Sequence, residues 1–217
     1  MVTSKRRKNG TDTASATRDR ILSAAARILS TKGYSATRLT DIAHCAEVRA
    51  PAVYYYFDSR EELIAEVMAV GQRRLREHVE SALTALPTGS PPMDRIDTAV
   101  QAHLQVELQL SDFATAVTRN QGQLPDDVRD RLRSEGAEYL GLWRRLLEEA
   151  RTAGLIRPDL DLRAARMLVM GALNWTPEWW NPHQGSLSTV IDTATSLVRH
   201  GLGFPLSQAH THNSNLR

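Results

Sequence analysis

The chain has 217 residues, 41% of them hydrophobic and 24% charged, which is the balance of an ordinary folded globular protein. The single cysteine, Cys45, excludes an intrachain disulfide, and no run approaches the ~20 apolar residues of a membrane-spanning helix. The net charge is +2, and the basic N-terminus lacks the apolar segment that follows in a secretory signal. We therefore expect a cytoplasmic protein with no membrane partner.

The charge is unevenly distributed along the chain. Residues 1–60 carry 11 Lys and Arg against 5 Asp and Glu, whereas the remainder carries 16 against 20. A basic amino-terminal part on an acidic remainder is typical of a protein that meets a polyanion with one end. Nucleic acid and an anionic membrane surface both satisfy this pattern, so charge alone does not choose between them.

The first predicted segment is a polar, disordered arm over residues 1–16, with the basic run Lys5-Arg6-Arg7-Lys8. It is either a solvated tail or an arm that adds phosphate or minor-groove contacts beside a DNA reader. A helix should begin near Thr17, whose hydroxyl can cap it, and should end at Gly33. Its apolar stripe consists of Ile21, Leu22, Ala25, Ile28 and Leu29.

Residues 37–60 contain two short helical segments separated by a tight polar break. Thr37 should cap the first segment, over residues 39–46, and the second, over residues 50–57, follows the break at residues 47–49. Pro51 is compatible with a first helical turn, which needs no N–H from it. A helix this short can lie across another helix and push its N-terminal side chains into a groove. The stretch therefore predicts a helix-turn-helix reader of DNA.

The residue types of this stretch suit different kinds of DNA contact. Small side chains at the start of the second segment can approach thymine methyls, and Arg49 beside them can hydrogen-bond a guanine or the backbone. Tyrosine hydroxyls and further arginines can reach phosphates. Tyr54 or Tyr56 taken singly is as well explained as a core residue, but three tyrosines on so short a helix are not. The predicted DNA-binding residues are Thr37, Arg38, Arg49, Ala50, Pro51, Ala52, Tyr54, Tyr55 and Arg60.

Beyond the predicted reader the pattern stays helical, with no alternating strand. Asp58-Ser59 should cap a long helix that ends near Leu86 and links the small head to a larger body. Further helices are expected over residues 93–110, 111–120, 125–154, 161–173 and 187–202. Met167–Leu173 is apolar all round and should be buried on more than one side, and residues 174–182 should break that helix. We expect a flexible tail at residues 205–217, with His210 and His212 too isolated for a metal site.

Residues 17–65 resemble the TetR family of bacterial one-component regulators. The resemblance rests on the run TRLTDIAHCAEVRAPAVYYYFDSREEL, preceded by a helix that ends in Lys-Gly-Tyr. Glu47 departs from the pattern, because these regulators usually have glycine at that place in the turn. The resemblance implies an all-α homodimer of about nine helices that binds a palindromic operator, with the last two helices of each subunit forming a four-helix interface. The expected domains are a helix-turn-helix head at 17–62 and a ligand-binding and dimerisation body at 63–204.

Three of the four tryptophans fall within residues 175–180, where they either pack at a corner or wall a ligand cavity. The segment L-N-W-T-x-x-W-x-x-P resembles one in TetR-type repressors of fatty-acid and sterol degradation, which respond to acyl-CoA thioesters. This resemblance implies an apolar site for the acyl or ring portion, with Arg163 or Arg166 meeting the CoA phosphates. His103 lies on an apolar helix and faces either a ligand or the core. The predicted ligand-binding residues are Phe113, Trp143, Arg166, Met170, Asn174, Trp175 and Trp179.

These patterns predict a transcriptional repressor released from operator DNA by a small effector, such as a CoA thioester of a fatty-acid or steroid degradation intermediate. One alternative is a regulator of drug efflux that senses an aromatic or cationic compound. An alternative of another class is an architectural DNA-binding protein without a ligand. An enzyme would need a nucleophile and a base facing the body's cavity, and the sequence shows no catalytic set, cofactor motif or metal-ligand cluster. We therefore expect no enzyme activity, no cofactor and no metal.

Overall fold

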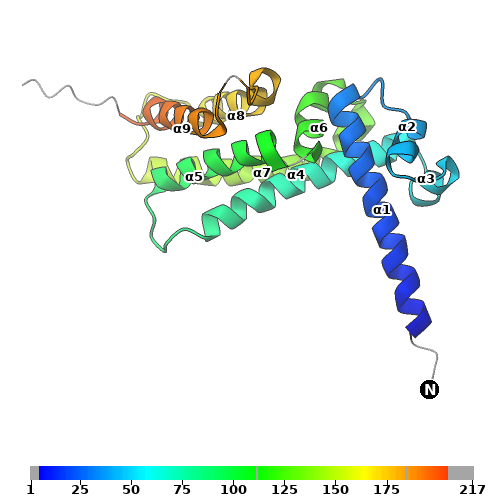
Figure 1. Cartoon of the computed structure of the whole chain (residues 1–217). Helices are drawn as coiled ribbons and strands as arrows, with labels where there is room; N and C mark the ends of the chain where they lie inside the picture. The colour runs from blue at the N-terminus through cyan, green and yellow to red at the C-terminus, as the bar shows by residue number, and fades with distance from the viewer. Residues whose placement is uncertain (1–4, 111, 184, 205–217) are drawn as a thin grey trace, which may run out of the picture.

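The computed structural model of the chain describes residues 5–110, 112–183 and 185–204. Within these ranges the chain forms nine α-helices and no strand, which confirms the predicted all-α fold (Figure 1). A π-helical turn, η1, follows α5, and a short 3-10 turn, η2, follows α6. The elements are α1 (Lys5–Lys32), α2 (Leu39–Cys45), α3 (Ala50–Tyr56), α4 (Arg60–Thr84), α5 (Pro92–Gln105), η1 (Val106–Leu110), α6 (Asp112–Asn120), η2 (Gln121–Gln123), α7 (Asp126–Thr152), α8 (Leu162–Trp179) and α9 (Leu187–Leu202).

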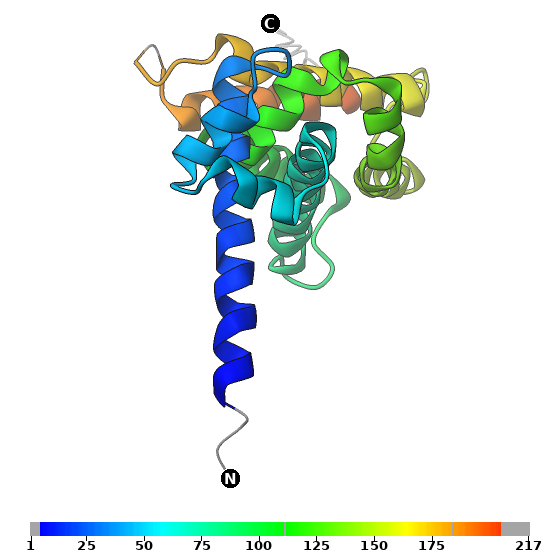
Figure 2. The ribbon, with the colours of Figure 1, turned by 90° about the vertical axis from the view of Figure 1, so that its right-hand side faces the viewer.

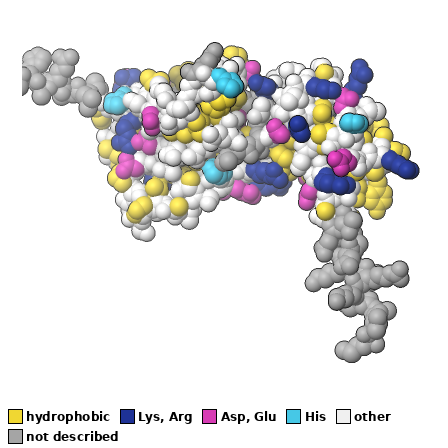
Figure 3. All heavy atoms as spheres, in the orientation of Figure 1, with side chains coloured by type: hydrophobic (Ala, Val, Ile, Leu, Met, Phe, Trp, Pro, Cys, Tyr) yellow, Lys and Arg dark blue, Asp and Glu magenta, His cyan; other side chains and the backbone are white. Residues whose placement is uncertain are grey.

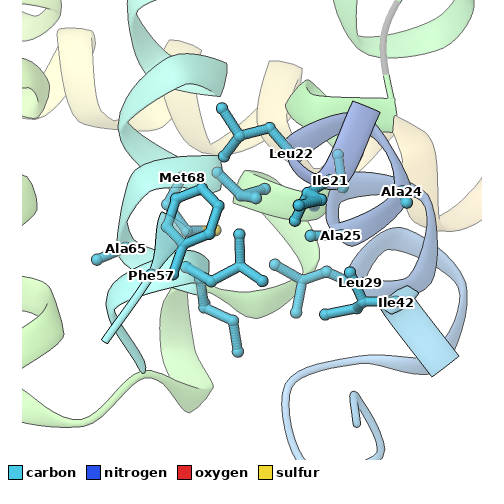
Figure 4. Close-up of a cluster of buried hydrophobic side chains, with 14 of the residues drawn as sticks. Ile21, Leu22, Ala24, Ala25, Leu29, Ile42, Phe57, Ala65 and Met68 are labelled. Carbon is cyan, nitrogen blue, oxygen red and sulfur yellow. The ribbon is translucent and has the colours of Figure 1, made fainter. Parts of the chain in front are cut away.

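The first hydrophobic core joins the C-terminal half of α1 to α2, α3 and the start of α4. Figure 4 shows Ile21, Leu22 and Leu29 of α1 facing Ile42 of α2 and Met68 of α4. Side chains of α6 and α7 also enter this core, so the head is packed directly against the body. The predicted division at residue 62 therefore stays a prediction, because one core spans it.

The second hydrophobic core belongs to the body. It is formed by the C-terminal half of α4 together with α5, α7, α8 and α9. Figures 1 and 2 show α4, α5 and α7 running side by side, with α8 and α9 packed across them. Trp143 of α7 is completely buried at the centre of this core. The body thus has its own apolar interior, as the helical periodicity predicts.

Helix α4 links the two cores. Its 25 residues extend about 38 Å, from Leu63 in the head core to Leu83 in the body core. The predicted cap is confirmed, because the Ser59 hydroxyl accepts a hydrogen bond from the Glu62 amide at 3.0 Å. The Glu62 carboxylate in turn accepts from the Asp58 amide at 2.6 Å. A movement of this helix would displace side chains in both hydrophobic cores.

Two predicted helix boundaries are wrong. Helix α1 begins at Lys5, so neither the disordered arm over residues 5–16 nor a cap at Thr17 is found, while residues 1–4 lie outside the described ranges. Figures 1 and 2 show this N-terminal part extending away from the rest. The segment contains no proline, and adding residues to an existing helix avoids the cost of nucleation.

Helix α8 does not break at residue 174 but continues to Trp179, with Pro177 inside it. Proline lacks the N–H that would bond the carbonyl four residues earlier, yet here it lies in the last turn, where little helix remains to be disrupted. The Thr176 hydroxyl donates to the Ala172 carbonyl at 3.1 Å, and the Trp180 amide still reaches the Thr176 carbonyl at 3.0 Å.

The predicted tail and its histidines lie outside the described residues. None of the described helices is long and apolar enough to cross a membrane.

Candidate nucleic-acid interface and ligand cavity

The turn between α2 and α3 is closed by two backbone hydrogen bonds. The Val48 amide donates to the Ala43 carbonyl at 3.0 Å, and the Glu47 amide donates to the His44 carbonyl at 3.1 Å. This is the Schellman pattern, whose left-handed position usually holds glycine. Here Glu47 occupies it, with φ of 54°. The turn therefore keeps the geometry that orients α3, although its residue departs from the family pattern.

Helix α3 has one buried face and one exposed face. Val53 and the adjoining Phe57 are packed into the head core. The side chains of Tyr54 and Tyr55 are 58% and 81% exposed. In Figure 3, Lys and Arg side chains and a group of hydrophobic side chains lie over the region that Figure 1 labels α2 and α3. We call the exposed set the recognition face; it consists of Arg38, Arg49, Pro51, Tyr54 and Tyr55.

Ala50 and Ala52 are half-buried beside the recognition face. They lie in the first turn of α3, next to its N-cap residue Arg49. Small side chains at this end let the helix approach a groove closely, while Arg49 and the two exposed tyrosines supply hydrogen-bonding groups. Seven of the nine predicted DNA-binding residues thus lie on or beside one accessible surface. Their contacts with DNA stay a prediction.

Thr37 and Arg60 occupy different environments from those predicted. Thr37 is buried and does not cap α2; its hydroxyl donates to the Gly33 carbonyl at 2.7 Å, and Arg38 is the N-cap. The Arg60 guanidinium donates to the carbonyls of Thr37 and Tyr34 and lies over the Tyr34 ring, 4.4 Å from its centre. Both residues therefore hold the α1–α2 loop onto α4. These bonds fix the position of the Arg60 guanidinium beside the loop rather than on the recognition face.

The body contains a cavity of about 230 Å³ between α4, η1, α6, α7 and α8. Its walls combine apolar side chains with several hydrogen-bonding groups. The apolar walls come from Leu75, Val117, Leu140, Met167 and Met170, and the polar groups from Gln72, Glu107, Thr118, Tyr139 and Asn174. An apolar cavity with a few convergent polar groups is the usual form of a small-molecule site.

Of the polar residues of this cavity, Glu107 and Tyr139 are buried, while Gln72, Thr118 and Asn174 are half-buried. Glu107 is 4% exposed, and the Thr118 hydroxyl donates to its Oε2 atom at 3.0 Å. Burial raises the pKa of Glu107 to about 7, and the Thr118 hydrogen bond opposes this only in part. Behind the cavity wall, His103 Nδ1 lies 2.8 Å from the Tyr139 hydroxyl. Burial lowers the pKa of His103 to about 4, so this histidine is neutral at pH 7 and faces the core rather than solvent.

Glu107 is presented by the π-helical turn η1, which continues α5. A π-turn widens the helix by one residue and is frequent at functional sites. The sequence signal for this residue is one acid between apolar neighbours, in the run His103-Leu-Gln-Val-Glu-Leu. That pattern also fits an exposed position on an amphipathic helix, so Glu107 was not predicted as a ligand-binding residue. Gln72, Thr118 and Tyr139 were not predicted as ligand-binding residues either.

The predicted ligand-binding residues separate into five environments. Met170 and Asn174 line the cavity. Trp175 and Asn174 line a neighbouring hollow of about 530 Å³ between α8 and the end of α1, and Trp179 is 56% exposed. Arg166 lines a third hollow, about 390 Å³, with Arg144 and Arg163. Phe113 and Trp143 were predicted as cavity walls, but both are buried in the two cores and do not line this cavity.

Helix α6 joins the cavity to the head. Thr118 lines the cavity, and the next two residues bond the end of α1. The Arg119 guanidinium donates to the Ser30 carbonyl at 3.1 Å and pairs with Glu178 of α8 at 3.1 Å. The Asn120 side chain accepts from the Tyr34 amide at 2.7 Å and donates to the carbonyl of Leu29. A ligand that moved α6 would act directly on the helix that supports the recognition face.

Helices α8 and α9 carry an exposed apolar face. Only Met170, Leu173 and Thr176 of α8 are buried, whereas Leu168 is 75% exposed and Leu197 of α9 is 69% exposed. The prediction that Met167–Leu173 is buried on more than one side is therefore not met within one chain. Large apolar side chains exposed on two helices that contact each other are typical of an interaction site.

Two family models match the chain. Residues 21–67 match the model described as bacterial regulatory proteins, tetR family, and residues 89–202 match the model described as tetracyclin repressor-like, C-terminal domain. Together they include α2, α3 and nearly all of the body.

Curated relatives and a solved structure are similar over most of the chain. The fatty acid metabolism regulator protein of Bacillus subtilis is 21% identical over 184 residues, which cover 84% of this chain and 93% of that protein. The HTH-type transcriptional repressor KstR2 of Rhodococcus jostii is 26% identical over 201 residues, covering 87% and 92%. The crystal structure of AibR in complex with isovaleryl coenzyme A and operator DNA has the same fold, with a TM-score of 0.74, 20% identity and coverage of 88% and 100%.

Proposed function

Because the chain belongs to the TetR family of bacterial transcriptional regulators, we propose that it is a repressor released from a palindromic operator by a small effector. The observation that carries this proposal is the position of the cavity. Its wall residue Thr118 is followed directly by Arg119 and Asn120, which bond the end of α1. An effector in the cavity therefore contacts the same helix that holds the head in place.

The operator contacts of the proposed repressor come from the recognition face. Arg49 and Pro51 lie at the start of α3, which enters the major groove with its N-terminal residues in proteins of this motif. Tyr54, Tyr55 and Arg38 are exposed and able to reach phosphates on either side. The two heads of a dimer would have to lie about one helical turn apart, ~34 Å, to read an inverted repeat.

The dimer is proposed from the exposed apolar face of α8 and α9. Met167, Leu168, Trp175 and Leu197 are each more than half exposed in the single chain. Packing the same face of a second copy against them would bury these side chains and form a four-helix interface. The all-round apolar pattern of Met167–Leu173 is explained in the same way.

The effector is proposed to be a CoA thioester with a short or compact acyl group. The cavity has apolar walls and a volume of about 230 Å³, which suits a small acyl or ring portion. Arg144, Arg163 and Arg166 line the hollow beside it, and Arg166 contacts the carbonyl of Leu140, a cavity residue, at 3.5 Å. Guanidinium groups are suited to phosphates, and Arg163 and Arg166 are the two of these that do not pair with Glu148, which lines the same hollow and lies 3.8 Å from Arg144. Relatives named for fatty-acid metabolism, and a neighbour that binds isovaleryl coenzyme A, support this choice.

The energy required of such an effector is modest. A thioester that binds the DNA-free arrangement a hundredfold more tightly shifts the equilibrium by about 2.7 kcal/mol. This lies within the usual range of about 1–3 kcal/mol for coupling between two sites. The effector's tighter binding to the arrangement with α6 displaced has to supply this energy and to offset the hydrogen bonds between α6 and α1 that are lost.

The test begins by selecting an operator from random duplex DNA with the purified full-length chain. We expect an inverted repeat, and Tyr55→Ala should weaken binding to all sequences and lower its salt dependence. Fluorescence anisotropy then follows release by CoA thioesters of short branched, linear and alicyclic acids, each compared with free CoA and the free acid. At least one thioester should release the operator at a tenfold lower concentration than its acid.

Arginine variants test the placement of the CoA phosphates. The double variant with Arg163→Ala and Arg166→Ala should raise the concentration of thioester needed for release by tenfold or more, without changing operator affinity. Arg131→Ala, an exposed arginine of α7 outside the hollow, is the matched control. A selection without any sequence preference would reject a repressor. Release by tetraphenylphosphonium and by no thioester would instead favour a regulator that senses cations.

A further inference from the structure

Glu107 is a buried carboxyl group without a cationic partner among the residues that the structure describes. It lies on the wall of the cavity, and no basic group contributes to the environment that sets its pKa. Carboxyl groups are rarely buried unless they are paired or hydrogen-bonded. The hydrogen bond from the Thr118 hydroxyl satisfies one oxygen of this group. A buried acid in this position needs an explanation beyond packing.

Further hydrogen-bonding groups converge on the same cavity. Asn174 and Tyr139 line it from α8 and α7, and the Gln72 amide enters from α4. The Gln72 Oε1 atom is buried and has no hydrogen-bond partner among the described residues. Groups from five helical segments thus meet at one small cavity, and an apolar molecule there would leave Gln72 Oε1 without a partner.

Glu107 is the one residue lining the cavity, among those described, that can carry a charge at pH 7. Threonine, asparagine, glutamine and tyrosine are uncharged, and the nearby His103 is kept neutral by burial. A carboxylate ligand would meet a buried carboxyl group, and an ammonium ligand would have to be desolvated, together with ionised Glu107, to form a buried ion pair. A neutral ligand oxygen can accept from Asn174 or a protonated Glu107, and a hydroxyl can also donate to Gln72 Oε1.

We propose that Glu107, Gln72, Thr118 and Asn174 form a subsite for a neutral oxygen group, a hydroxyl or a ketone, on the part of the effector that enters the cavity. The inference rests on the proposed function of this cavity as the effector site. It assigns to the effector an oxygenated acyl chain or ring rather than a plain hydrocarbon one. The volume of about 230 Å³ accommodates a six-membered ring, since a dry cavity of about 150 Å³ is known to hold benzene.

Direct binding of small ring compounds tests the subsite without DNA or CoA. The purified full-length chain is titrated at pH 7 with cyclohexanol, cyclohexanone, methylcyclohexane, cyclohexylamine and cyclohexanecarboxylate, using calorimetry and tryptophan fluorescence. Cyclohexanol or cyclohexanone should bind at least tenfold more tightly than the other three, a difference of about 1.4 kcal/mol. Equal binding of methylcyclohexane, tighter binding of either charged ring, or no binding by the oxygenated rings would overturn the proposal.

Two variants locate the effect at the subsite. Glu107→Leu removes the polar group and should abolish the preference for cyclohexanol over methylcyclohexane, whereas Glu107→Gln keeps hydrogen-bonding capacity and should retain it. Thr118→Val has nearly the same volume and should reduce the preference severalfold, which provides a result even if Glu107→Leu does not fold. Glu138→Gln, on the exposed side of α7, is the control and should leave the preference unchanged. A preference that survives both Glu107→Leu and Thr118→Val would place the bound ring elsewhere.

The same probes separate this inference from the proposed function. Ring binding is measured without operator DNA, so it does not depend on release. A chain that prefers cyclohexanol but is released by no thioester would keep the subsite and reject the proposed effector class. A chain that is released by plain alkyl thioesters and shows no preference among the rings would keep the repressor and reject the subsite.

Discussion

Glu47 and Glu107 are acids in two environments that disfavour them for different reasons. Glu47 is exposed, but its backbone lies in the left-handed region, where a Cβ atom is crowded by the following carbonyl. Glu107 lies on the π-helical turn and is buried beside an apolar cavity, so its charged form is disfavoured. Both acids lie in segments that connect or interrupt α-helices, one in the turn between α2 and α3 and the other on η1.

Replacing Glu47 by glycine should stabilise the head. Glycine has no Cβ and adopts positive φ freely, so Glu47→Gly should raise the free energy of unfolding by about 1 kcal/mol. Glu47→Ala removes the charge and keeps the strained Cβ, so it should change the free energy by less than about 0.5 kcal/mol. Urea unfolding of the purified variants measures both. A glycine variant no more stable than the alanine variant would show that the turn carries no strain.

Glu107 should make the protein less stable as the pH rises. Its folded-state pKa of about 7 exceeds the ordinary value of 4.5, so the folded chain binds the proton more tightly than the unfolded chain. Full stability is therefore present below pH 4.5 and is lost as the pH rises to 7, a decrease of about 3 kcal/mol. Glu107→Gln should lack this decrease.

The comparison of wild type with Glu107→Gln isolates this effect. The lowered pKa of His103 acts in the opposite direction, since it costs stability as the pH falls from 6.5 to 4, but it is present in both proteins and cancels. In urea unfolding from pH 5 to pH 8, the free energy of unfolding of Glu107→Gln should rise steadily relative to that of the wild type. A constant difference over this range would mean that Glu107 is not protonated in the folded protein.

At the scale of elements, α4 and α6 approach most closely at Gly71. A Cβ atom added there would lie 2.7 Å from the Phe113 carbonyl oxygen and 2.7 Å from Val117 Cγ2, closer than real contacts allow. The same part of α6 carries Thr118 and Asn120, so the close crossing helps to set the distance between the cavity and the end of α1. Glycine is required here for close approach rather than for an unusual φ.

Alanine at Gly71 should destabilise the protein, whereas alanine at Gly141 should stabilise it. Gly71→Ala forces the two helices apart and should cost about 1–3 kcal/mol in the free energy of unfolding. Gly141 lies in α7 with its nearest neighbour, Arg145, 3.7 Å from the added atom. Gly141→Ala should therefore gain up to about 1 kcal/mol from helix propensity alone. Thermal and urea unfolding compare the two, and a stabilising Gly71→Ala would contradict the close crossing.

At the scale of the whole molecule, the recognition face and the exposed apolar face lie on separate parts of the chain. The first belongs to α3 and the loop before α2, and the second to α8 and α9, which lie over α5 and α7 in Figure 1. Between them lie the cavity and α6. Binding of a second copy at one end would fix the separation of two heads at the other, with the cavity placed to alter that separation.

Charges on the apolar face should produce a monomer. The double variant with Leu168→Glu and Leu197→Glu places four carboxylates in a two-fold interface, so sedimentation should show a single chain and operator affinity should fall at least a hundredfold. Leu155→Glu, on an exposed leucine outside this face, is the matched control and should change neither property. A double variant that still sediments as a dimer would place the interface elsewhere.

Most of the fold follows from local patterns in the sequence. Helical periodicity predicted all nine helices found among the described residues, seven of them with about their observed ends, and the capping hydrogen bonds at Ser59 and Glu62 were confirmed. The errors are at helix ends. The start of α1 and the end of α8 depend on whether a helix continues past weak signals, and neither Thr17 nor Pro177 was enough to stop it.

The sequence by itself determined the all-α class, the helix-turn-helix stretch and its exposed residues, because periodicity, caps and turn residues act within a few positions of one another. Only the tertiary structure decided which side chains meet at the cavity. Gln72, Glu107, Thr118, Tyr139 and Asn174 come from five separate segments, and no local pattern records their proximity. It also decided that Arg60 bonds the loop at Thr37 and that Trp143 belongs to the core, since both depend on how distant helices pack.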